Sequence, residues 1–286
     1  MAVIYRKLIL LPFFILCFVN LQGKQDTTKT ILLGLESGYF SYTSIDDIFI
    51  PFAYSGGAAF YSFNKIVIKK SVFRQLNITY AFIDRKPVSL NLRSSYTILR
   101  YDEGLSSVWE TDPKYLEVKT NIAKIESKYL IKTPIQFLPN DLLYVGFVGN
   151  IDAIFRAEIT NPELISLTIN PGILYRLPIK KIFNLAMQSN FNLAGISFRK
   201  SYADAEAQVT NNYNFNYFKD YFFNHLQFDL INKYFKTTSS ITIEKKISRS
   251  FSINLGYQFE YLNMAKPKRL SSVSNSFQIG ILYRIK

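Results

Sequence analysis

The sequence predicts an all-β fold, a closed antiparallel transmembrane β-barrel of about 12 strands, with about 10 or 14 as alternatives. Two observations predict it: apolar and polar residues alternate with a period of two along most of the chain, and no stretch after the N-terminal segment has eighteen consecutive apolar residues. The 48% hydrophobic and 19% charged residues also suit a membrane protein, but an AT-rich genome favours the same residues. The pattern, rather than the composition, therefore decides the fold class.

The first 23 residues have the three-part layout of a secretory signal peptide. Arg6 and Lys7 precede an uninterrupted apolar run, Leu8–Val19, and a polar end follows with Gly23 as its small residue. Twelve residues at about 1.5 Å rise each are too short to span a bilayer as a helix. We expect cleavage after Gly23, with lipoprotein processing at Cys17 and a retained signal anchor as the alternatives.

Residues 24–286 then form one barrel domain after the signal peptide of residues 1–23. Loss of two basic residues changes the net charge from +13 to +11, and the only cysteine leaves with the signal. One cysteine and one histidine exclude multi-ligand zinc sites, iron–sulfur clusters, disulfide scaffolds and Cys–His nucleophile pairs. We expect no metal and no cofactor.

The alternating segments follow one another from the first third of the chain to its end. Successive strand side chains point to opposite faces, so each segment has one apolar face and one polar or small face. In chain order they are Leu76–Phe82, Leu90–Tyr101, Leu116–Ile122, Leu142–Phe155, Ile165–Tyr175, Phe183–Leu193, Phe222–Phe235, Ile241–Glu244, Phe251–Tyr261 and Phe277–Ile285. Near Glu126 the apolar positions change from even to odd numbers, which predicts a bulge or a turn there.

Alternation alone also fits a soluble β-sandwich or a lipocalin-like barrel. Three features favour lipid outside: the apolar faces hold almost no charged residues over about ten positions, aromatic residues gather toward segment ends, and the opposite faces are rich in Asn, Ser, Thr and Gln. Backbone groups in lipid must all be paired, so the sheet must close. The longer polar connections at 102–114, 199–213 and 263–274 are expected outside the cell, and short turns such as Leu177–Lys180 in the periplasm.

The last segment, Phe277–Ile285, resembles the C-terminal strand of bacterial outer-membrane β-barrel proteins. It departs from that family's pattern by ending in Ile285 and Lys286 rather than in an aromatic residue. The resemblance names an architecture and no subfamily. It implies a bacterial outer-membrane location, and as partners outer-membrane lipid, lipopolysaccharide, the barrel-insertion machinery and periplasmic chaperones. A nucleic-acid partner is not expected for an exported barrel.

His225 is the one residue that invites a catalytic interpretation. It shares a predicted strand face with Gln227 and Asp229, and some outer-membrane barrels are hydrolases that use a histidine with serine or carboxylate partners. His225 and Asp229 stand four residues apart, about 13 Å along a strand, so they cannot hydrogen-bond directly. The simpler interpretation is a polar residue in a hydrated wall or loop, so no catalytic residue is assigned.

Charged residues on the predicted inner face form a second candidate site. Rings of opposite charge set selectivity in pores, but equal numbers of both signs also interlock as salt bridges that fill a narrow barrel. The expected inward residues are Glu36, Arg93, Glu117, Lys119, Lys128, Lys132, Asp152, Arg176, Asp229, Glu244, Glu260 and Arg284. We consider the interlocked arrangement the better of the two.

The remaining positive charge falls mostly in connections and predicts a basic rim at the two membrane surfaces. Its members include Lys69, Lys70, Arg85, Lys86, Arg199, Lys245 and Lys246. A further cluster, Lys266, Lys268 and Arg269, is a candidate contact for lipopolysaccharide phosphates, with a solvated loop as the simpler alternative.

The functional interpretation is a non-enzymatic outer-membrane barrel, either a small-solute pore or a structural or accessory component. An outer-membrane hydrolase using His225 is the rival from another class. A barrel subunit of a secretion or surface-assembly complex is the third hypothesis.

Overall fold

A computed structural model describes most of the chain after the N-terminal segment. The described ranges are 29–46, 50–88, 96–102, 105–111, 118–138, 140–156, 162–179, 182–199, 226–265 and 270–285. The expected signal peptide, residues 1–23, lies outside them. Within these ranges, no helix has the length and apolar character needed to cross a bilayer.

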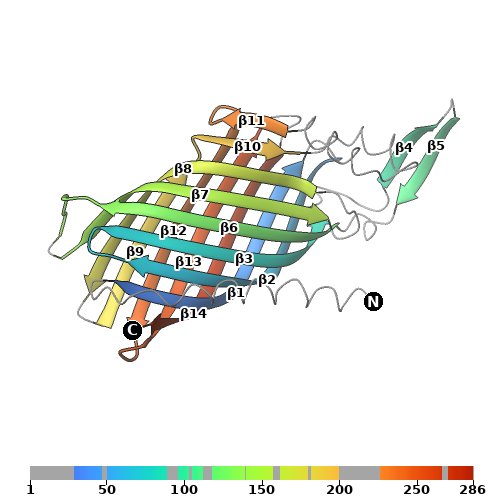
Figure 1. The fold of residues 1–286 in the computed structure, drawn as a ribbon. Coiled ribbons are helices and arrows are strands. Elements are labelled where there is room, and N and C mark those ends of the chain that lie inside the picture. The colour runs from blue at the N-terminus through green and yellow to red at the C-terminus, as the bar shows by residue number, and fades with distance from the viewer. Residues whose placement is uncertain are drawn as a thin grey trace, which may run out of the picture.

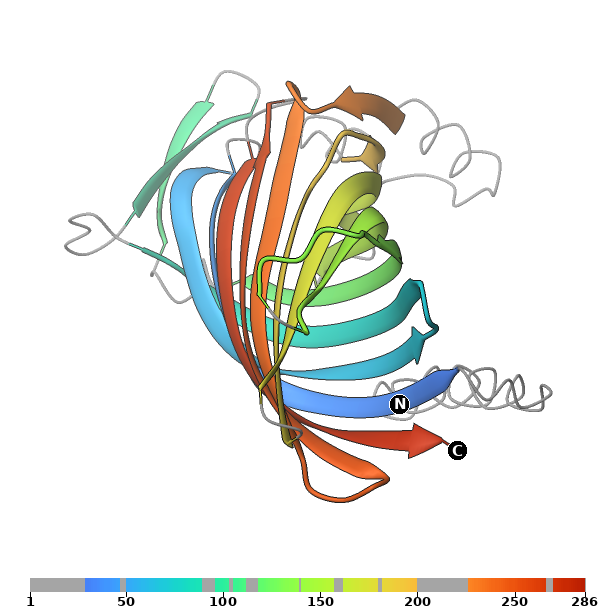
Figure 2. The same ribbon diagram turned by 90° about the vertical axis from the view of Figure 1, so that its left-hand side faces the viewer.

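Twelve strands form one antiparallel sheet, which closes into a barrel (Figures 1 and 2). The sheet order is β11-β10-β8-β7-β6-β3-β2-β1-β14-β13-β12-β9, and an additional pairing of β8 with β9 closes ten of these strands into a ring. The strands are β1 (Thr30–Asp46), β2 (Ile50–Ile68), β3 (Val72–Pro87), β6 (Val118–Lys132), β7 (Leu142–Arg156), β8 (Pro162–Ile179), β9 (Phe183–Phe191), β10 (Ala194–Phe198), β11 (Leu226–Leu230), β12 (Tyr234–Lys246), β13 (Phe251–Met264) and β14 (Leu270–Ile285). The predicted closed antiparallel barrel is confirmed.

A separate two-stranded hairpin consists of β4 (Tyr96–Asp102) and β5 (Leu105–Thr111). The segment Leu90–Tyr101 was expected in the wall, and residues 102–114 as a loop. The described part of the first segment pairs only with β5, from Tyr96↔Thr111 to Asp102↔Leu105. For the described residues both expectations are therefore wrong, because Tyr96–Asp102 and Leu105–Thr111 pair with each other in a sheet separate from the barrel.

The first and last strands pair with each other in the wall. β1 pairs with β14 without a register break, from Ile31↔Ile285 to Asp46↔Leu270. The connection expected at 263–274 is shorter than predicted, since β13 runs to Met264 and β14 begins at Leu270. The serine-rich start of β14 looks like a loop in sequence, but Ser272, Ser274 and Ser276 are buried on the inner face, where small polar side chains fit.

One edge of β8 is covered along its length by two successive strands. β9 pairs with Gly172–Ile179, and β10 pairs with Ile165–Ile169. Between them the Asn192 side chain accepts a hydrogen bond from the backbone N–H of Lys236 at 2.5 Å and donates one to the Tyr234 carbonyl. An asparagine amide thus supplies the backbone pairing that the break in the strand interrupts.

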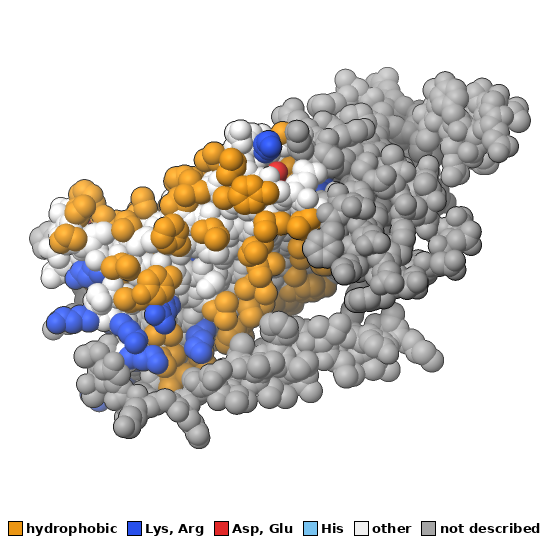
Figure 3. Space-filling model, turned by 45° about the horizontal axis from the view of Figure 1, so that its top comes forward, with side chains coloured by type: hydrophobic (Ala, Val, Ile, Leu, Met, Phe, Trp, Pro, Cys, Tyr) orange, Lys and Arg blue, Asp and Glu red, His pale blue; other side chains and the backbone are white. Residues whose placement is uncertain are grey.

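The outer wall of the barrel is apolar. Alternate residues of β13 and β14 such as Leu255, Phe277 and Ile279 are more than half exposed, while Asn254 and Glu260 are buried on the opposite face. Phe251 to Tyr261 covers about 33 Å along the strand, or about 25 Å of barrel height at a typical tilt of about 40°. Figure 3 shows hydrophobic side chains spread over the face of the barrel that is turned to the viewer. The wall therefore matches the hydrocarbon layer of a membrane.

The barrel has two unlike ends. At one end, which we call the turn end, strands are joined by short connections that include residues 69–71, 133–141 and 247–250. β1 begins and β14 ends at this same end. The opposite end, the loop end, carries the connections 88–117 and 199–225. The turn end lies at the left of Figure 1.

β6 runs without interruption where the sequence predicted a bulge or a turn near Glu126. Its register with β3 and with β7 is continuous, and its even-numbered residues face inward throughout. The prediction failed because Ile122 is an apolar residue on the inner face, packed in a buried cluster with Phe40 and Phe60. Apolar positions therefore do not mark the lipid face where the interior itself is apolar.

Two apolar clusters occupy the barrel interior. The loop-end cluster draws residues from most of the wall strands: Phe40, Tyr42, Phe60, Ala81, Ile83, Ile122, Ile154, Leu164, Tyr234, Leu262, Met264 and Leu270. The turn-end cluster consists of Phe73, Leu130, Tyr144, Val148 and Leu174, with partly buried residues such as Ile66 packed against it. Between the two clusters the interior is polar and charged.

Candidate functional site inside the barrel

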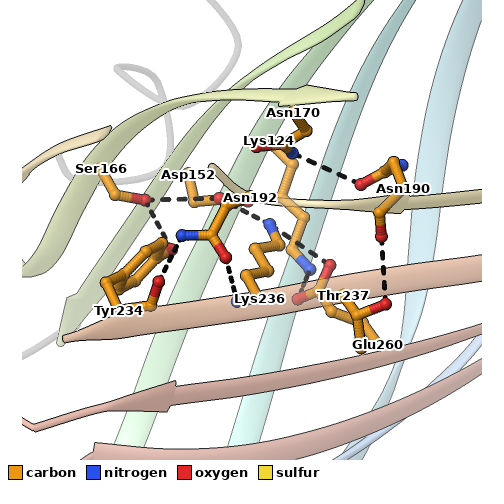
Figure 4. Close-up of polar contacts among 10 residues, drawn as sticks. All are labelled: Lys124, Asp152, Ser166, Asn170, Asn190, Asn192, Tyr234, Lys236, Thr237 and Glu260. Carbon is orange, nitrogen blue, oxygen red and sulfur yellow. Dashed lines mark hydrogen bonds and ion pairs between the residues drawn. The ribbon is translucent and has the colours of Figure 1, made fainter. Parts of the chain in front are cut away.

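A network of ion pairs crosses the barrel interior between the two apolar clusters (Figure 4). The Lys236 ammonium lies 2.6 Å from Asp152 Oδ2 and 3.4 Å from Glu260 Oε2. Lys124 Nζ lies 2.6 Å from Glu260 Oε1. Each lysine is thus matched by a carboxylate, and Glu260 is shared by both.

The Lys124–Glu260 pair joins opposite walls of the barrel. Lys124 lies on β6 and Glu260 on β13, and these strands are five places apart in the ring of ten. Lys236 on β12 reaches Asp152 on β7, which lies three places away round the same ring. The Lys124–Glu260 contact therefore crosses the barrel interior from one wall to the opposite one.

The hydroxyl group of Ser166 links the buried Asp152 carboxylate to the hydroxyl group of Tyr234. Ser166 Oγ lies 3.4 Å from Asp152 Oδ2 and 3.2 Å from the Tyr234 hydroxyl. All three side chains are buried, and a buried charge is tolerated only when charged and hydrogen-bonding partners compensate for its lost hydration. The arrangement stabilises a fixed negative charge.

A second polar layer, around Lys128, lies nearer the turn end than the layer that contains Lys124. Lys128 Nζ makes an ion pair with Glu126 at 2.8 Å and hydrogen bonds to Gln75 Oε1 at 3.0 Å and Gln188 Oε1 at 2.6 Å. Gln75 lies on β3 and Gln188 on β9, so this lysine also links strands from different sides of the ring. The interior is therefore crossed twice.

A small cavity remains beside the central network. It has a volume of about 60 Å³ and is lined by Lys124, Glu126, Lys236, Gln258 and Glu260 among others. This is room for only a few water molecules.

A larger cavity of about 160 Å³ lies at the turn end. Arg176, Glu244, Lys246 and Arg284 line it, and the nearest approach of Arg176 to Glu244 is a long 3.8 Å between Nη2 and Oε2. Asn184 Nδ2 donates a hydrogen bond to Glu244 Oε2 at 3.3 Å.

Nine of the twelve residues expected on the inner face lie there. Glu36, Lys128, Asp152, Asp229, Glu244 and Glu260 are buried, and Lys132, Arg176 and Arg284 are half-buried toward the turn end. Glu36 accepts a hydrogen bond from Asn254, and Asp229 accepts one from Ser197. The structure brings Asp152 and Glu260 together through Lys236, and Arg176 with Glu244, whereas Glu36 and Asp229 lie apart from these groups.

The expected position of Lys119 is wrong. It was expected inside, but it is exposed on the outer face, opposite the exposed Asp84 in the β3–β6 register. The error has the same cause as the predicted bulge in β6, because inward Ile122 was taken to face lipid. The other expected site residues, Arg93, Glu117, His225, Lys266, Lys268 and Arg269, lie outside the described residues.

Sequence reasoning missed Lys124 and Lys236, the two lysines that organise the network, and assigned Arg85 to a connection. Arg85 is buried at the loop end, where its Nε donates to Thr120 Oγ1 at 2.8 Å and its guanidinium lies over the Tyr42 and Tyr54 rings. The even parity of Lys124 with Lys128, and of Lys236 with Glu244, was the available signal for the first two.

The described residues contain no group of three or more His, Cys, Asp or Glu side chains placed to hold a metal ion. Two ion pairs bridge different strands: Lys124–Glu260 joins β6 to β13, and Lys236–Asp152 joins β12 to β7. What this arrangement does chemically is to hold opposite walls together.

Comparison with known proteins gives no family model and no curated relative that matches this sequence. Similar solved structures include the outer membrane protease OmpT from Escherichia coli, at 8% identity over 90% of this chain and 96% of that chain with a TM-score of 0.43. The β domain of the Bordetella autotransporter BrkA has 8% identity, covers 88% and 99% of the two chains and has a TM-score of 0.40. Neisserial surface protein A has 7% identity, covers 89% and 97%, and has a TM-score of 0.38.

The closed sheet, the apolar outer wall and the polar interior are the architecture of bacterial outer-membrane β-barrel proteins. The chain has this architecture.

Proposed function

We propose that this protein is a sealed structural or accessory barrel of the outer membrane rather than a small-solute pore. The observation that carries the proposal is the 2.6 Å ion pair between Lys124 and Glu260, which joins opposite strands of the ring. Large porins leave an aqueous channel because about 16 to 18 strands enclose more space than side chains fill, whereas side chains can fill the interior of about eight strands. The ring of ten strands here is close to the smaller size.

Four layers support a sealed interior. Aromatic and aliphatic side chains of the loop-end cluster lie toward one end, and those of the turn-end cluster lie toward the other. Between them lie the ion-pair network and the layer around Lys128. The cavity left beside the network, about 60 Å³, is too small to form a continuous water column.

Planar-bilayer recording tests this function. The mature protein, shown to be inserted by heat-modifiable gel migration, is expected to give no unitary conductance above that of the bare bilayer. A large porin recorded in the same bilayers serves as the positive control. Stepwise conductance from the folded wild-type protein would overturn the proposal and favour a small-solute pore.

Export by a cleavable signal peptide is part of the same proposal. N-terminal sequencing of the protein recovered from outer membranes is expected to begin at Lys24, after the apolar run Leu8–Val19 has been removed. A sequence that begins at Cys17 would replace this with lipoprotein processing, and one that begins at Met1 or Ala2 with a retained anchor.

The remaining parts of the proposal concern partners. Outer-membrane lipid surrounds the apolar wall, and lipopolysaccharide phosphates are the proposed contacts of Lys266, Lys268 and Arg269. Insertion requires periplasmic chaperones and the barrel-insertion machinery, and a surface-assembly partner would be found by copurification in mild detergent.

A further inference from the structure

The turn end of the barrel carries a strong excess of positive charge. In the described turns and strand ends at this end, eleven basic residues face only two acidic ones, Glu244 and Asp141. The basic residues are Lys29, Lys65, Lys69, Lys70, Arg74, Lys132, Arg176, Lys245, Lys246, Arg249 and Arg284. Figure 3 shows lysine and arginine side chains gathered at this end, which is on the left of the view.

The 160 Å³ cavity lies within this basic region. Three of its lining side chains are cationic, Arg176, Lys246 and Arg284, and one is anionic, Glu244. The cavity therefore has two positive charges more than negative ones. Lys246 and Pro178 at its rim are exposed, so it opens to solvent at the turn end.

The positive charges that line this cavity are not fully neutralised by carboxylates of the described residues. Among the described residues, the guanidinium of Arg284 and the ammonium of Lys246 take part in no ion pair, and Glu244 lies a long 3.8 Å from Arg176. Asp141 is not among the residues that line the cavity, and its carboxylate accepts hydrogen bonds from the backbone N–H groups of Phe137 and Leu138 in its own turn. A cavity with low-dielectric walls and one sign of charge raises the local concentration of the opposite ion.

The lining also sets the kind of anion. Arginine forks and a lysine ammonium match the oxygens of a phosphoryl group, and Asn184 adds an amide donor. Drug-sized ligands occupy sites of roughly 300 to 1,000 Å³, so a cavity about half the smaller size suits a single small group. Leu32, Ile68 and Leu142 supply an apolar side to the same cavity.

We propose that the turn-end cavity is a binding site for a phosphoryl anion held by Arg284, Lys246 and Arg176. Two sources share this chemistry: free phosphate or a small phosphate ester, and the headgroup of an anionic phospholipid in the adjoining leaflet. The site is separate from the sealed interior, and its existence does not require the barrel to be non-conducting.

The test measures phosphate binding to the folded mature protein in phosphatidylcholine nanodiscs at low ionic strength, by ³¹P line broadening with inorganic phosphate. Saturable binding is expected, weakened about three- to tenfold by Arg284→Gln or by Lys246→Gln. Glu244→Gln is expected to tighten binding, because it removes the one carboxylate that competes with the anion. Misfolding would weaken phosphate binding in every variant. Weaker binding by Lys246→Gln together with tighter binding by Glu244→Gln therefore indicates a binding site.

Lys245→Gln is the matched control, since Lys245 is the exposed neighbour of Lys246 on β12 and lies over the Phe183 ring outside the cavity. Its affinity for phosphate is expected to equal that of the wild type. Absence of saturable binding, or equal affinities for Lys246→Gln and Lys245→Gln, would overturn the proposal.

Nanodiscs that contain phosphatidylglycerol separate the two sources. If the lipid headgroup occupies the site, inorganic phosphate binds more weakly there than in phosphatidylcholine, and Arg284→Gln removes the difference. If a free anion is the ligand, phosphate binds with the same affinity in both lipids. Either outcome supports a phosphoryl site and identifies its source.

Discussion

At the residue scale, Lys236 is buried on the inner face of β12 between the carboxylates of Asp152 and Glu260. An ion pair taken out of water contributes little net stability compared with apolar residues of the same size, but removal of one partner leaves the other charge buried without compensation. The network therefore adds little to the free energy of unfolding of the wild type, but substitution of one of its members alone is expected to be strongly destabilising.

Lys236→Met is expected to lower the free energy of unfolding by about 3 to 5 kcal/mol, because Asp152 loses its cation. Asp152→Leu combined with Lys236→Met should recover part of that loss, since Glu260 keeps Lys124 as its partner. Urea unfolding in lipid vesicles, followed by gel mobility, measures both variants.

The control is Lys245→Ala, an exposed lysine on the same strand, which should change the unfolding free energy by less than about 0.5 kcal/mol. Equal losses from Lys236→Met and Lys245→Ala would show that the buried ion pairs are not those described here.

A second residue-scale prediction concerns Asp141 in the connection between β6 and β7. Burial by itself raises the pKa of its carboxyl. Hydrogen bonds from the Leu138 and Phe137 N–H groups lower the pKa by more than burial raises it, so the pKa lies below the ordinary value. A lowered folded-state pKa stabilises the fold above the unfolded pKa of about 3.9. This stabilisation is lost as the pH falls through the folded pKa.

Asp141→Ala should therefore lower the urea midpoint at pH 7 and have a smaller effect at pH 2. Unfolding curves of the wild type and the variant at the two pH values give the comparison. A difference between the two proteins that stays constant with pH would contradict the role of the ionised carboxylate.

At the element scale, the course of β6 shows where sequence reasoning works and where it stops. The outer faces of β8, β9, β13 and β14 were predictable, because polar inward residues alternate with apolar outward ones. β6 was not, because Ile122 and Leu130 are apolar residues packed inside the barrel. Which strand lies opposite another follows only from closure, so the Lys124–Glu260 contact had no local signature.

A glycine in β7 provides an element-scale prediction. A Cβ atom on Gly146 would overlap the backbone carbonyl oxygen of Tyr129 on β6, which cannot move without disturbing the strand pairing. Gly146→Ala is therefore expected to destabilise the barrel by about 1 to 3 kcal/mol.

Gly149→Ala, three residues further along the same strand, is the matched control. The nearest atom to its added Cβ is Ser127 O at 3.9 Å, so a change within about 0.5 kcal/mol is expected. The same urea assay applies, and a loss as large as that of Gly146→Ala would argue against the close approach of β6 and β7.

At the scale of the whole molecule, apolar residues face outward and mostly polar residues face inward along the strands of the closed sheet. The period-two pattern and the C-terminal strand were sufficient to predict a closed membrane barrel. They did not predict whether it is open, because that depends on how inward residues from distant strands meet. Arg85, placed in a connection from sequence, is buried near Tyr42 and Tyr54 for the same reason.

The most direct test of a sealed membrane barrel is cysteine scanning along β13, which the absence of other cysteines from residues 24–286 makes straightforward. Single cysteines at outward positions 253 and 255 and at inward positions 254 and 258 are reacted in lipid vesicles. For a sealed membrane barrel, brominated lipid is expected to quench the outward labels, and the inward positions are expected to react slowly with a charged water-soluble thiol reagent. Rapid reaction at the inward positions would reveal a water-filled lumen and contradict a sealed barrel.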